Sequence, residues 1–169
     1  MLLGYYFWKE QDMTLEEKIV KELQKQKMTV TTAESCTGGL VSSTLINYPG
    51  ISSVFIEGCV TYSNESKINR LGVNPSTLEI YGAVSEETAR EMAEGVAKNF
   101  NTNVAISTTG IAGPDGGTSD KPVGLVYIGI YINGKTSVNK YIFQGNREEI
   151  RFRATKNALN DLRLKLLEI

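Results

Sequence analysis

The sequence predicts an α/β fold, a three-layer α/β/α sandwich built on a mixed β-sheet in a single domain. Its 169 residues suit one domain, because domains hold roughly 100 to 200 residues. Helical and strand patterns alternate through the first two thirds of the chain, which favours parallel strands joined by helices. The last third contains Asn133-Gly134 between two apolar runs, the typical signal of a tight antiparallel hairpin. Parallel and antiparallel pairs in one sheet make it mixed.

The first part of the chain predicts a helix, a strand and a second helix. Residues 14–27 have apolar side chains at helical spacing behind a possible capping box at Thr14-Leu15-Glu16-Glu17. Residues 28–33 are short and β-branched, which favours a strand. A helical pattern resumes at Leu40 and stops at Tyr48-Pro49-Gly50. Residues 1–12 are expected to be a poorly ordered N-terminal extension, so the domain comprises residues 13–169.

The middle of the chain predicts one strand and three helices. Residues 54–62 alternate as a strand whose members on one face are Val54, Ile56, Gly58, Val60 and Tyr62. Each following helix begins at a residue that can cap it or at a proline. The expected starts are Ser63 or Asn64 for a helix that carries Lys67, Asn74-Pro75 for a second short helix, and Ser85 for residues 86–99.

The last part predicts three strands and a final helix. A strand at about 103–108 leads into residues 109–122, which contain four glycines and two prolines and show no hydrophobic periodicity. A loop of this length in a compact domain is more often functional than not. Residues 123–132 and 135–143 form the hairpin, and Asn146 to Glu149 can cap the helix that ends the chain.

The composition excludes several kinds of protein. The chain has no histidine, so neither a Ser-His-Asp triad nor a zinc site with imidazole ligands can form. Its 18 Lys+Arg against 19 Asp+Glu give no basic excess that would attract nucleic acid or an anionic membrane. Two cysteines are too few for a disulfide framework, which favours a reducing, cytoplasmic setting. Any acid or base must be Lys, Tyr, Asp, Glu or a thiol.

Polar or glycine-bearing segments follow three of the predicted strands, at residues 34–39, 62–67 and 109–117. Ligands of open α/β sheets bind beyond the carboxyl ends of the strands, so these segments are expected to share one site. Ser35 stands where a strand turns into a helix, and a serine needs a base to accept its proton. Lys67 and Tyr62 are the candidate bases. Two structural alternatives remain open. In one, Ser35 only caps a helix, and in the other, Lys67 is an ordinary surface lysine.

Two further features bear on the site. Cys36 is an alternative nucleophile beside a helix N-terminus, although unpaired cysteines are more often small buried hydrophobes. The loop at 109–117 lacks the Gly-Lys-Ser/Thr ending of a P-loop, but its backbone amides could hold a phosphate or a ribose. Arg147, at the start of the last helix, is either an anion clamp or a surface arginine.

Five blocks of the sequence resemble one known family, the CinA C-terminal domain family of nicotinamide mononucleotide amidohydrolases. They occur in the expected order between Met13 and the C-terminus. The blocks are Thr32 to Leu40 (TAESCTGGL), Gly58 to Lys67 (GCVTYSNESK), Gly82 to Ser85 (GAVS), Thr109 to Pro114 (TGIAGP) and Lys121 to Gly124 (KPVG).

The resemblance implies hydrolysis of the carboxamide of nicotinamide mononucleotide to nicotinic acid mononucleotide and ammonia. It implies Ser35 as the nucleophile, Lys67 as the base and Tyr62 as a hydroxyl that relays or orients the proton. Implied substrate-binding residues are Thr37, Gly38, Gly39, Asn64, Thr109, Gly110, Gly113 and Arg147. No metal or cofactor is expected. The family also suggests a homo-oligomer, with the small-molecule substrate as partner and neither nucleic acid nor membrane.

Two other functions remain open on the sequence. A catalytically silent nucleotide-binding module would keep the glycine loops but would tolerate replacement of Ser35 or Lys67. An interaction module of the competence or DNA-damage response is the second alternative, and the near-neutral charge gives it no support.

Overall fold

The structure, a computed structural model, describes residues 13–169, so the predicted extension at 1–12 lies outside the described residues. A five-stranded sheet in the order β2-β1-β3-β4-β5 forms its centre. The strands are β1 (Val30–Glu34), β2 (Phe55–Val60), β3 (Val104–Gly110), β4 (Leu125–Ile132) and β5 (Lys135–Ile142). β2, β1 and β3 run parallel, whereas β4 pairs antiparallel with both β3 and β5. The predicted mixed sheet is confirmed.

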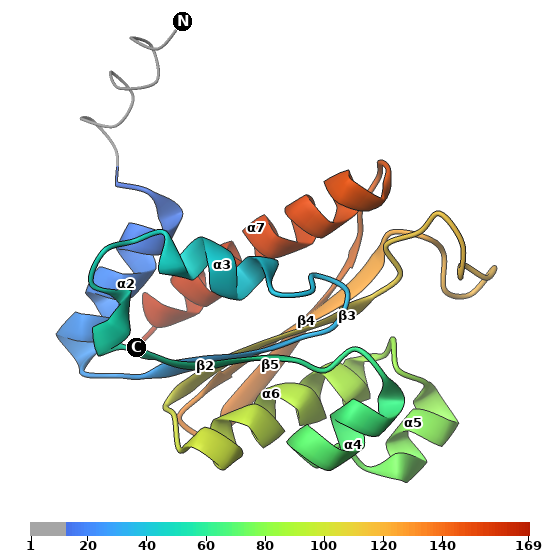
Figure 1. Cartoon of the computed structure of the whole chain (residues 1–169), viewed down its shortest axis with the longest axis horizontal. Helices are drawn as coiled ribbons and strands as arrows, with labels where there is room; N and C mark the ends of the chain where they lie inside the picture. The colour runs from blue at the N-terminus through green and yellow to red at the C-terminus, as the bar shows by residue number, and fades with distance from the viewer. Residues whose placement is uncertain (1–12) are drawn as a thin grey trace, which may run out of the picture.

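Helices cover both faces of the sheet, which confirms the predicted three layers (Figure 1). α2, α3 and α7 lie on one face, and α4, α5 and α6 lie on the other. The helices are α2 (Leu15–Gln26), α3 (Leu40–Ile46), α4 (Asn64–Leu71), α5 (Pro75–Tyr81), α6 (Glu86–Phe100) and α7 (Arg147–Leu166), with a short 3₁₀ turn, η1, at Ile51–Ser53.

The sequence sets the helix starts through side chains that accept backbone N–H groups. Thr14, Ser63 and Ser85 each accept the N–H group three residues ahead, as the sequence predicts. Asn146 and Glu149 form a complete capping box at the start of α7. These caps fix where α4 and α7 begin, and both helices bring residues to the site.

The core consists of two apolar clusters, one on each side of the sheet. The larger cluster joins α2, α3 and α7 to the sheet through fully buried side chains such as Ile19, Leu45 and Leu159. The smaller cluster lies under α6 and includes Met92 and Val96. Because both faces of β1 and β3 are covered, these strands are buried along almost their whole length.

Two local predictions were wrong. Thr109 and Gly110 belong to β3 and pair with Tyr127 and Val126, because β4 extends far enough to continue the ladder past residue 108. In β2 the alternation is interrupted, since the register shifts where Val30 pairs with Phe55 and Thr31 with Glu57. β2 is an edge strand, so apolar side chains of the predicted face, Ile56 and Val60, are about half exposed.

Candidate active site

The site lies where the three parallel strands end. Glu34, the last residue of β1, is in register with Val60 of β2 and with Thr108 of β3. The chain segments that leave these strands therefore emerge side by side, at the edge of the sheet where α4 also begins. This is the edge at which ligands bind in open α/β sheets.

Ser35 and Lys67 meet at this edge. The Nζ atom of Lys67 lies 3.2 Å from the Oγ atom of Ser35. Ser35 follows β1 directly and its backbone N–H donates to the carbonyl of Thr108, which fixes the residue to β3. Lys67 lies on α4, one turn after the Ser63 cap. The predicted pairing of a serine with a lysine is thus present in the structure.

Lys67 is held in an unusual environment for a lysine. Its side chain is 1% exposed, and no carboxylate forms an ion pair with it within residues 13–169. Nζ instead donates to the backbone carbonyls of Thr61 at 2.9 Å and Tyr62 at 3.1 Å. Burial lowers the pKa of Lys67 from its ordinary value, because desolvation disfavours the charged ammonium.

The hydrogen bonds of Lys67 indicate how its amine can act on Ser35. A neutral amine has two N–H donors and one lone pair, whereas the ammonium has three donors and no acceptor. The carbonyls of Thr61 and Tyr62 occupy two donors. In the neutral form the lone pair is then left to face Ser35, which can donate its hydroxyl proton to it. The surface-lysine alternative is wrong.

The turn after Ser35 presents backbone amides. Gly38 and Gly39 have φ values of 58° and 99°, a left-handed conformation that glycine adopts without strain. The N–H of Gly38 donates to the carbonyl of Ser35 at 3.1 Å, so this amide is already used. Within residues 13–169 the N–H groups of Cys36, Thr37 and Gly39 donate to no protein acceptor. Cys36 and Thr37 are buried, whereas Gly39 is partly exposed, so the Gly39 amide is the one most open to a ligand.

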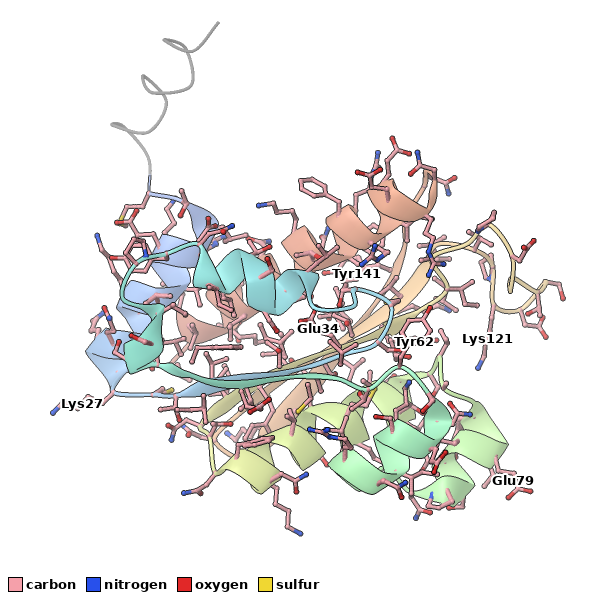
Figure 2. All side chains as sticks on the ribbon, viewed as in Figure 1. Lys27, Glu34, Tyr62, Glu79, Lys121 and Tyr141 are labelled. Atoms are coloured by element: carbon pink, nitrogen blue, oxygen red, sulfur yellow. The ribbon has the colours of Figure 1, made fainter. Side chains whose placement is uncertain are left out.

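A second group of predicted residues gathers around Arg147. Its Nη1 atom donates to the carbonyl of Gly113 at 2.6 Å, and its Nη2 atom donates to the hydroxyl of Tyr62 at 3.2 Å. The Tyr62 side chain is 61% exposed and lies at the end of the sheet (Figure 2). Its hydroxyl makes no hydrogen bond to Ser35 or Lys67. The side chain of Tyr62 is therefore joined to Arg147, whereas its backbone carbonyl accepts from Lys67.

Other predicted binding residues have side chains that are used inside the fold. The hydroxyl of Thr37 donates to Glu34 at 2.6 Å, and the hydroxyl of Thr109 donates to the carbonyl of Ala83 at 2.6 Å. Gly110 packs so closely against the backbone of β4 that a Cβ would lie 2.6 Å from the carbonyl oxygen of Leu125. Asn64 is exposed at the start of α4. The side chains of Thr37 and Thr109 are therefore not free to bind a ligand.

Cys36 is a poor candidate nucleophile. It belongs to the larger apolar cluster and is 6% exposed. Burial raises the pKa of its thiol to about 12, so the reactive thiolate is absent at neutral pH. Its structure matches a small buried hydrophobe.

Two residues that hold the turn after Ser35, Glu34 and Arg151, were not predicted from the sequence. Glu34 is buried between α3 and the sheet, where Figure 2 labels it, and its carboxylate binds Thr37 and the start of α3. Arg151 on α7 donates to the carbonyls of Cys36 and Thr37, both at 3.0 Å. The sequence offers one signal for Glu34, which is a charged residue at the end of a predicted strand. Arg151 lies more than a hundred residues from the turn, and no local pattern indicates it.

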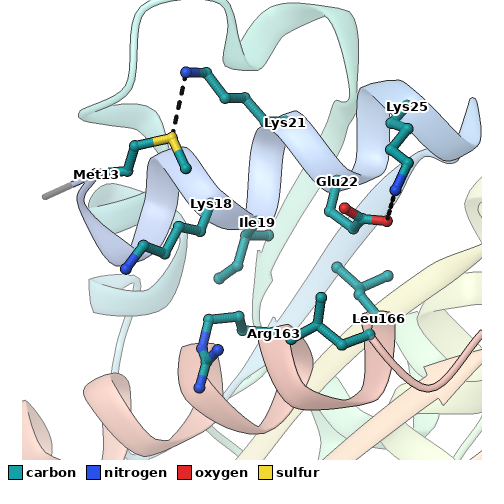
Figure 3. A pocket seen from close by; sticks show the side chains of 9 residues that line it. Met13, Lys18, Ile19, Lys21, Glu22, Lys25, Arg163 and Leu166 are labelled. Atoms are coloured by element: carbon teal, nitrogen blue, oxygen red, sulfur yellow. Dashed lines mark hydrogen bonds and ion pairs between the residues drawn. The ribbon is translucent and has the colours of Figure 1, made fainter.

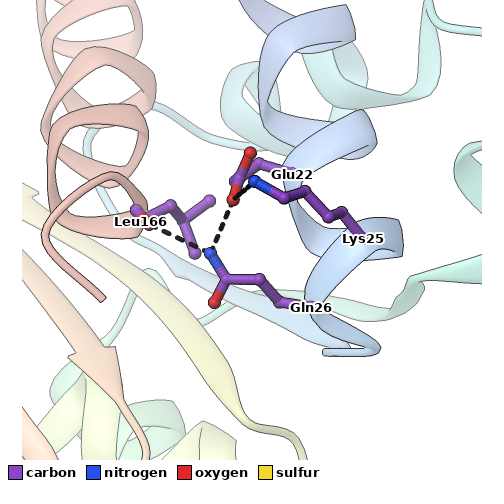
Figure 4. A network of polar contacts seen from close by, with 4 residues as sticks. All are labelled: Glu22, Lys25, Gln26 and Leu166. Atoms are coloured by element: carbon purple, nitrogen blue, oxygen red, sulfur yellow. Dashed lines mark hydrogen bonds and ion pairs between the residues drawn. The ribbon is translucent and has the colours of Figure 1, made fainter.

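The surface has one hollow beside this site and another at the other end of the sheet. An open hollow of about 590 Å³ lies beside the turn, over the first two turns of α7, and is lined by Leu40, Arg147, Glu148, Glu149, Arg151 and Phe152. A smaller hollow of about 260 Å³ lies between α2 and α7 at the other end of the sheet, with Ile19 and Leu166 in its floor (Figure 3). There Gln26 donates to Glu22 and to the carbonyl of Leu166, which joins the two helices (Figure 4). The distant hollow contains no nucleophile and no unpaired buried base, so the chemistry points to the Ser35 edge.

The fold and site define an α/β protein with a serine and a buried lysine at the carboxyl edge of a mixed sheet. Residues 12–166 match the family model of the CinA C-terminal domain. The chain belongs to this family, which confirms the resemblance found in the sequence.

Curated relatives and solved structures agree with this assignment. A putative competence-damage inducible protein of Clostridioides difficile (strain 630) is 61% identical over 171 residues, covering 97% of this chain and 41% of the relative. One from Clostridium perfringens (strain 13 / Type A) is 60% identical and covers 99% of this chain and 40% of the relative. The chain therefore spans about two fifths of the length of these relatives.

Two crystal structures show how closely the fold is shared. A CinA superfamily protein from Klebsiella pneumoniae 700603 superposes with a TM-score of 0.88 at 32% identity, covering 92% of this chain and 97% of that one. The competence/damage inducible protein CihA from Agrobacterium tumefaciens gives a TM-score of 0.87 at 40% identity, covering 90% of this chain and 93% of that one.

No helix within residues 13–169 is long and apolar enough to cross a membrane.

Proposed function

We propose that this chain hydrolyses the carboxamide of nicotinamide mononucleotide, with Ser35 as nucleophile and Lys67 as base. One observation carries the proposal: a buried lysine without a carboxylate partner among the described residues lies 3.2 Å from a serine hydroxyl. Burial keeps the amine neutral more easily, and a neutral amine can accept the serine proton. The reaction and substrate come from the resemblance to the CinA C-terminal family.

The first half of the proposed reaction forms an ester on Ser35. Lys67 accepts the hydroxyl proton as Oγ attacks the carboxamide carbon, and the carbonyl oxygen becomes an oxyanion. The N–H group of Gly39 is the proposed donor to this oxyanion, since it lacks an acceptor within residues 13–169 and Gly39 is partly exposed. The C–N bond then breaks, Lys67 returns the proton to the leaving nitrogen, and ammonia departs.

The second half releases the acid. A water molecule loses a proton to Lys67 and attacks the ester carbon. The Oγ–C bond breaks, Ser35 recovers its proton from Lys67, and nicotinic acid mononucleotide leaves. The overall change is one amide and one water converted to one carboxylic acid and one ammonia, and the steps assigned to this chain need only Ser35, Lys67 and backbone amides.

Arg147 and Tyr62 are proposed to bind the nucleotide part of the substrate. The guanidinium lies at the mouth of the site beside the exposed Tyr62 ring and borders the larger hollow. Arg147 donates two hydrogen bonds to protein groups and has further N–H donors for a phosphate. The cytoplasmic location, the homo-oligomer and the absence of nucleic-acid and membrane partners stay predictions.

The experiment that tests the proposal measures ammonia release from nicotinamide mononucleotide by the wild-type protein and by Ser35→Ala. Activity in the wild type and its loss in the variant would support the assignment. Ser66→Ala is a matched control, because this serine lies on the same helix as Lys67 and outside the site. Nucleotide binding without ammonia release by the wild type would favour the silent binding module instead.

A further inference from the structure

The hollow beside the Ser35 turn extends beyond Arg147, the residue proposed to bind the phosphate of the substrate. Its lining continues from Arg147 to Arg151 and Phe152 on α7 and to Leu40 at the start of α3. α3 and α7 lie on the same face of the sheet (Figure 1). The volume of about 590 Å³ is within the range of roughly 300 to 1,000 Å³ that small-molecule sites have in proteins. The part beyond Arg147 is therefore large enough for a ligand that the proposed reaction does not use.

Phe152 is the aromatic residue of this hollow. Its side chain is 58% exposed. A single exposed apolar side chain is common on protein surfaces and has no meaning by itself. Phe152, however, lines the hollow together with two arginines. An accessible aromatic ring beside arginine is the combination on which proteins stack nucleobases.

Arg147 supplies positive charge to the hollow. The residue is exposed, and within residues 13–169 no carboxylate forms an ion pair with it. The carbonyl of Gly113 and the hydroxyl of Tyr62 accept hydrogen bonds from two of its nitrogen atoms. A guanidinium has five N–H donors, so further donors remain for an anion, and arginine geometry suits phosphate.

The first two turns of α7 carry the groups that a nucleotide needs. Residues four apart are neighbours on a helix surface, so Arg147 and Arg151 form one row, and Glu148 and Phe152 form the next. All four residues line the hollow. Arg147 and Phe152 are separated by roughly 7.5 Å along the helix axis, at 1.5 Å per residue. This separation leaves room for a ribose between a phosphate on Arg147 and a base on Phe152, with the Glu148 carboxylate available to accept ribose hydroxyls.

The charges around Phe152 favour an uncharged base. Nζ of Lys156 lies 5.6 Å from the centroid of the Phe152 ring, so a positive charge already interacts with this ring. Arg151 adds a second positive charge to the lining. Like charges repel, so a pyridinium ring is disfavoured on Phe152. A purine is neutral, and its two fused rings offer a larger face for stacking.

We infer that this hollow binds a purine nucleoside 5′-phosphate, with its base on Phe152 and its phosphate on Arg147. Arg147 is also the proposed partner of the phosphate of nicotinamide mononucleotide, so the two nucleotides should compete. The binding site is argued from the hollow and its lining, whereas the competition rests on the proposed function. Such competition makes the rate of amide hydrolysis depend on the concentration of purine nucleotides.

Calorimetric titration of the protein with adenosine 5′-monophosphate (AMP) tests the binding site. Phe152→Ala removes the ring and keeps Arg147, so the affinity for AMP should fall by about 5-fold to 150-fold, the usual effect of removing a stacking partner. Phe152→Tyr keeps a ring and should keep most of the affinity. Leu164→Ala is the matched control, because Leu164 is an exposed apolar residue of the same helix outside the hollow. Thermal melting shows whether each variant keeps its fold.

Titration with ribose 5-phosphate separates the base from the phosphate. This compound lacks the base, so it should bind more weakly than AMP and should bind wild type and Phe152→Ala equally. Arg147→Met should weaken the binding of both compounds. The inference is overturned if wild type does not bind AMP, if Phe152→Ala binds AMP as tightly as wild type, or if ribose 5-phosphate binds as tightly as AMP.

Inhibition kinetics test the competition. AMP should raise the KM of the wild type for nicotinamide mononucleotide and leave kcat unchanged. Phe152→Ala should keep the wild-type kcat and KM but lose most of the inhibition. Inhibition that lowers kcat without a change in KM would overturn the shared use of Arg147. A large rise in KM caused by Phe152→Ala alone would overturn the separate purine site, because it would place Phe152 in the substrate site.

The titrations and the activity assay can fail independently. If wild type releases no ammonia but binds AMP through Phe152, the proposed function is wrong and the purine site is supported. If wild type is active but binds AMP no better than Phe152→Ala does, the proposed function is supported and the purine site is wrong.

Discussion

Lys67 Nζ lies 3.2 Å from Ser35 Oγ, although the two residues are 32 positions apart in the chain. The sheet makes this contact possible, because β1 and β2 are parallel neighbours and end in register. Ser35 leaves the first strand at this edge, and α4 delivers Lys67 just after the second. The backbone carbonyls of Thr61 and Tyr62 then hold the amine against the serine.

Replacement of Lys67 by methionine should remove turnover and keep substrate binding. Methionine fills a similar volume without an amine, so no group remains to accept the Ser35 proton. General-base removal typically lowers rates by about 10² to 10⁴, and we expect kcat to fall by that factor. Ammonia release gives kcat, and calorimetric titration of the nucleotide gives the affinity. Lys98→Met on the exposed side of α6 serves as the control. Lost affinity with normal turnover at saturation would show that Lys67 binds substrate instead.

The lowered pKa of Lys67 predicts how the proposed activity depends on pH. The proposed base would act only when neutral, so kcat/KM should rise with pH and level off above the pKa of Lys67 in the free protein, at a pH below the ordinary value of 10.5. Stability should rise with pH between the folded pKa of Lys67 and 10.5, because over this range the unfolded lysine binds a proton that the folded one has released. Rate profiles and denaturant titrations across pH test both effects. Activity that falls as pH rises toward the folded pKa would contradict the role of Lys67.

Cys36→Ala should keep full kcat. The thiol is buried in the larger apolar cluster and its pKa is raised to about 12, so it supplies no nucleophile. Removing one buried sulfur atom should instead lower the free energy of unfolding by about 1 kcal/mol. Ammonia release and chemical denaturation measure the two effects. A variant that folds but has no activity would transfer the nucleophile from Ser35 to Cys36.

How far the sequence predicts this site depends on which interactions are local. The helix starts at Ser63 and Asn146 follow from caps within four residues, and the mixed sheet follows from the order of patterns and the hairpin. The proximity of Ser35 and Lys67 follows from the rule for strand ends. The contacts of Arg151 with the carbonyls of Cys36 and Thr37 do not follow from any such rule. They join segments separated by more than a hundred residues and depend on how α7 packs across the sheet.

The directions of the side chains around the site could not be predicted from local sequence patterns either. Tyr62 is adjacent in sequence to the serine–lysine site, yet its hydroxyl binds Arg147 from the other end of the chain. Thr109 was expected in a loop but lies in β3, because β4 pairs with it. Both results depend on sheet register and helix packing, which the periodicity of one segment does not determine.

Arg147→Met should weaken binding of the phosphate and leave the chemical step intact. The guanidinium donates to Gly113 and Tyr62 and makes no hydrogen bond to Ser35, so it should contribute to KM rather than kcat. A hydrogen bond to a charged group contributes about 1.5 to 3 kcal/mol, which corresponds to a rise of about 10-fold to 150-fold in KM. Nicotinamide riboside lacks the phosphate, so its kcat/KM should hardly change in the variant. Equal losses for both compounds would show that Arg147 acts through Tyr62 or Gly113 instead.

At the far edge of the sheet, Tyr141 and Asn139 of β5 donate to the carboxylate of Asp161 on α7 at 2.8 and 3.1 Å. Burial raises the pKa of Asp161 above its ordinary value of 3.8, and the two hydrogen bonds partly offset this by stabilising the charged form. Since the folded pKa is raised, the favourable contribution of Asp161 is present below 3.8 and is lost as pH rises through the folded value. At neutral pH the buried carboxylate is therefore stabilised by its two hydrogen-bond donors.

Tyr141→Phe removes one of these donors and should lower the free energy of unfolding by about 1 to 3 kcal/mol at pH 7. The loss should shrink in acid, where Asp161 is protonated and no longer needs a second donor. Denaturant titrations at pH 7 and at acidic pH measure the difference. Tyr81→Phe is the control, because the Tyr81 hydroxyl makes no hydrogen bond within residues 13–169 and its ring is exposed. A loss for Tyr141→Phe that is larger in acid than at pH 7 would show that the phenol stabilises the protonated acid rather than the carboxylate.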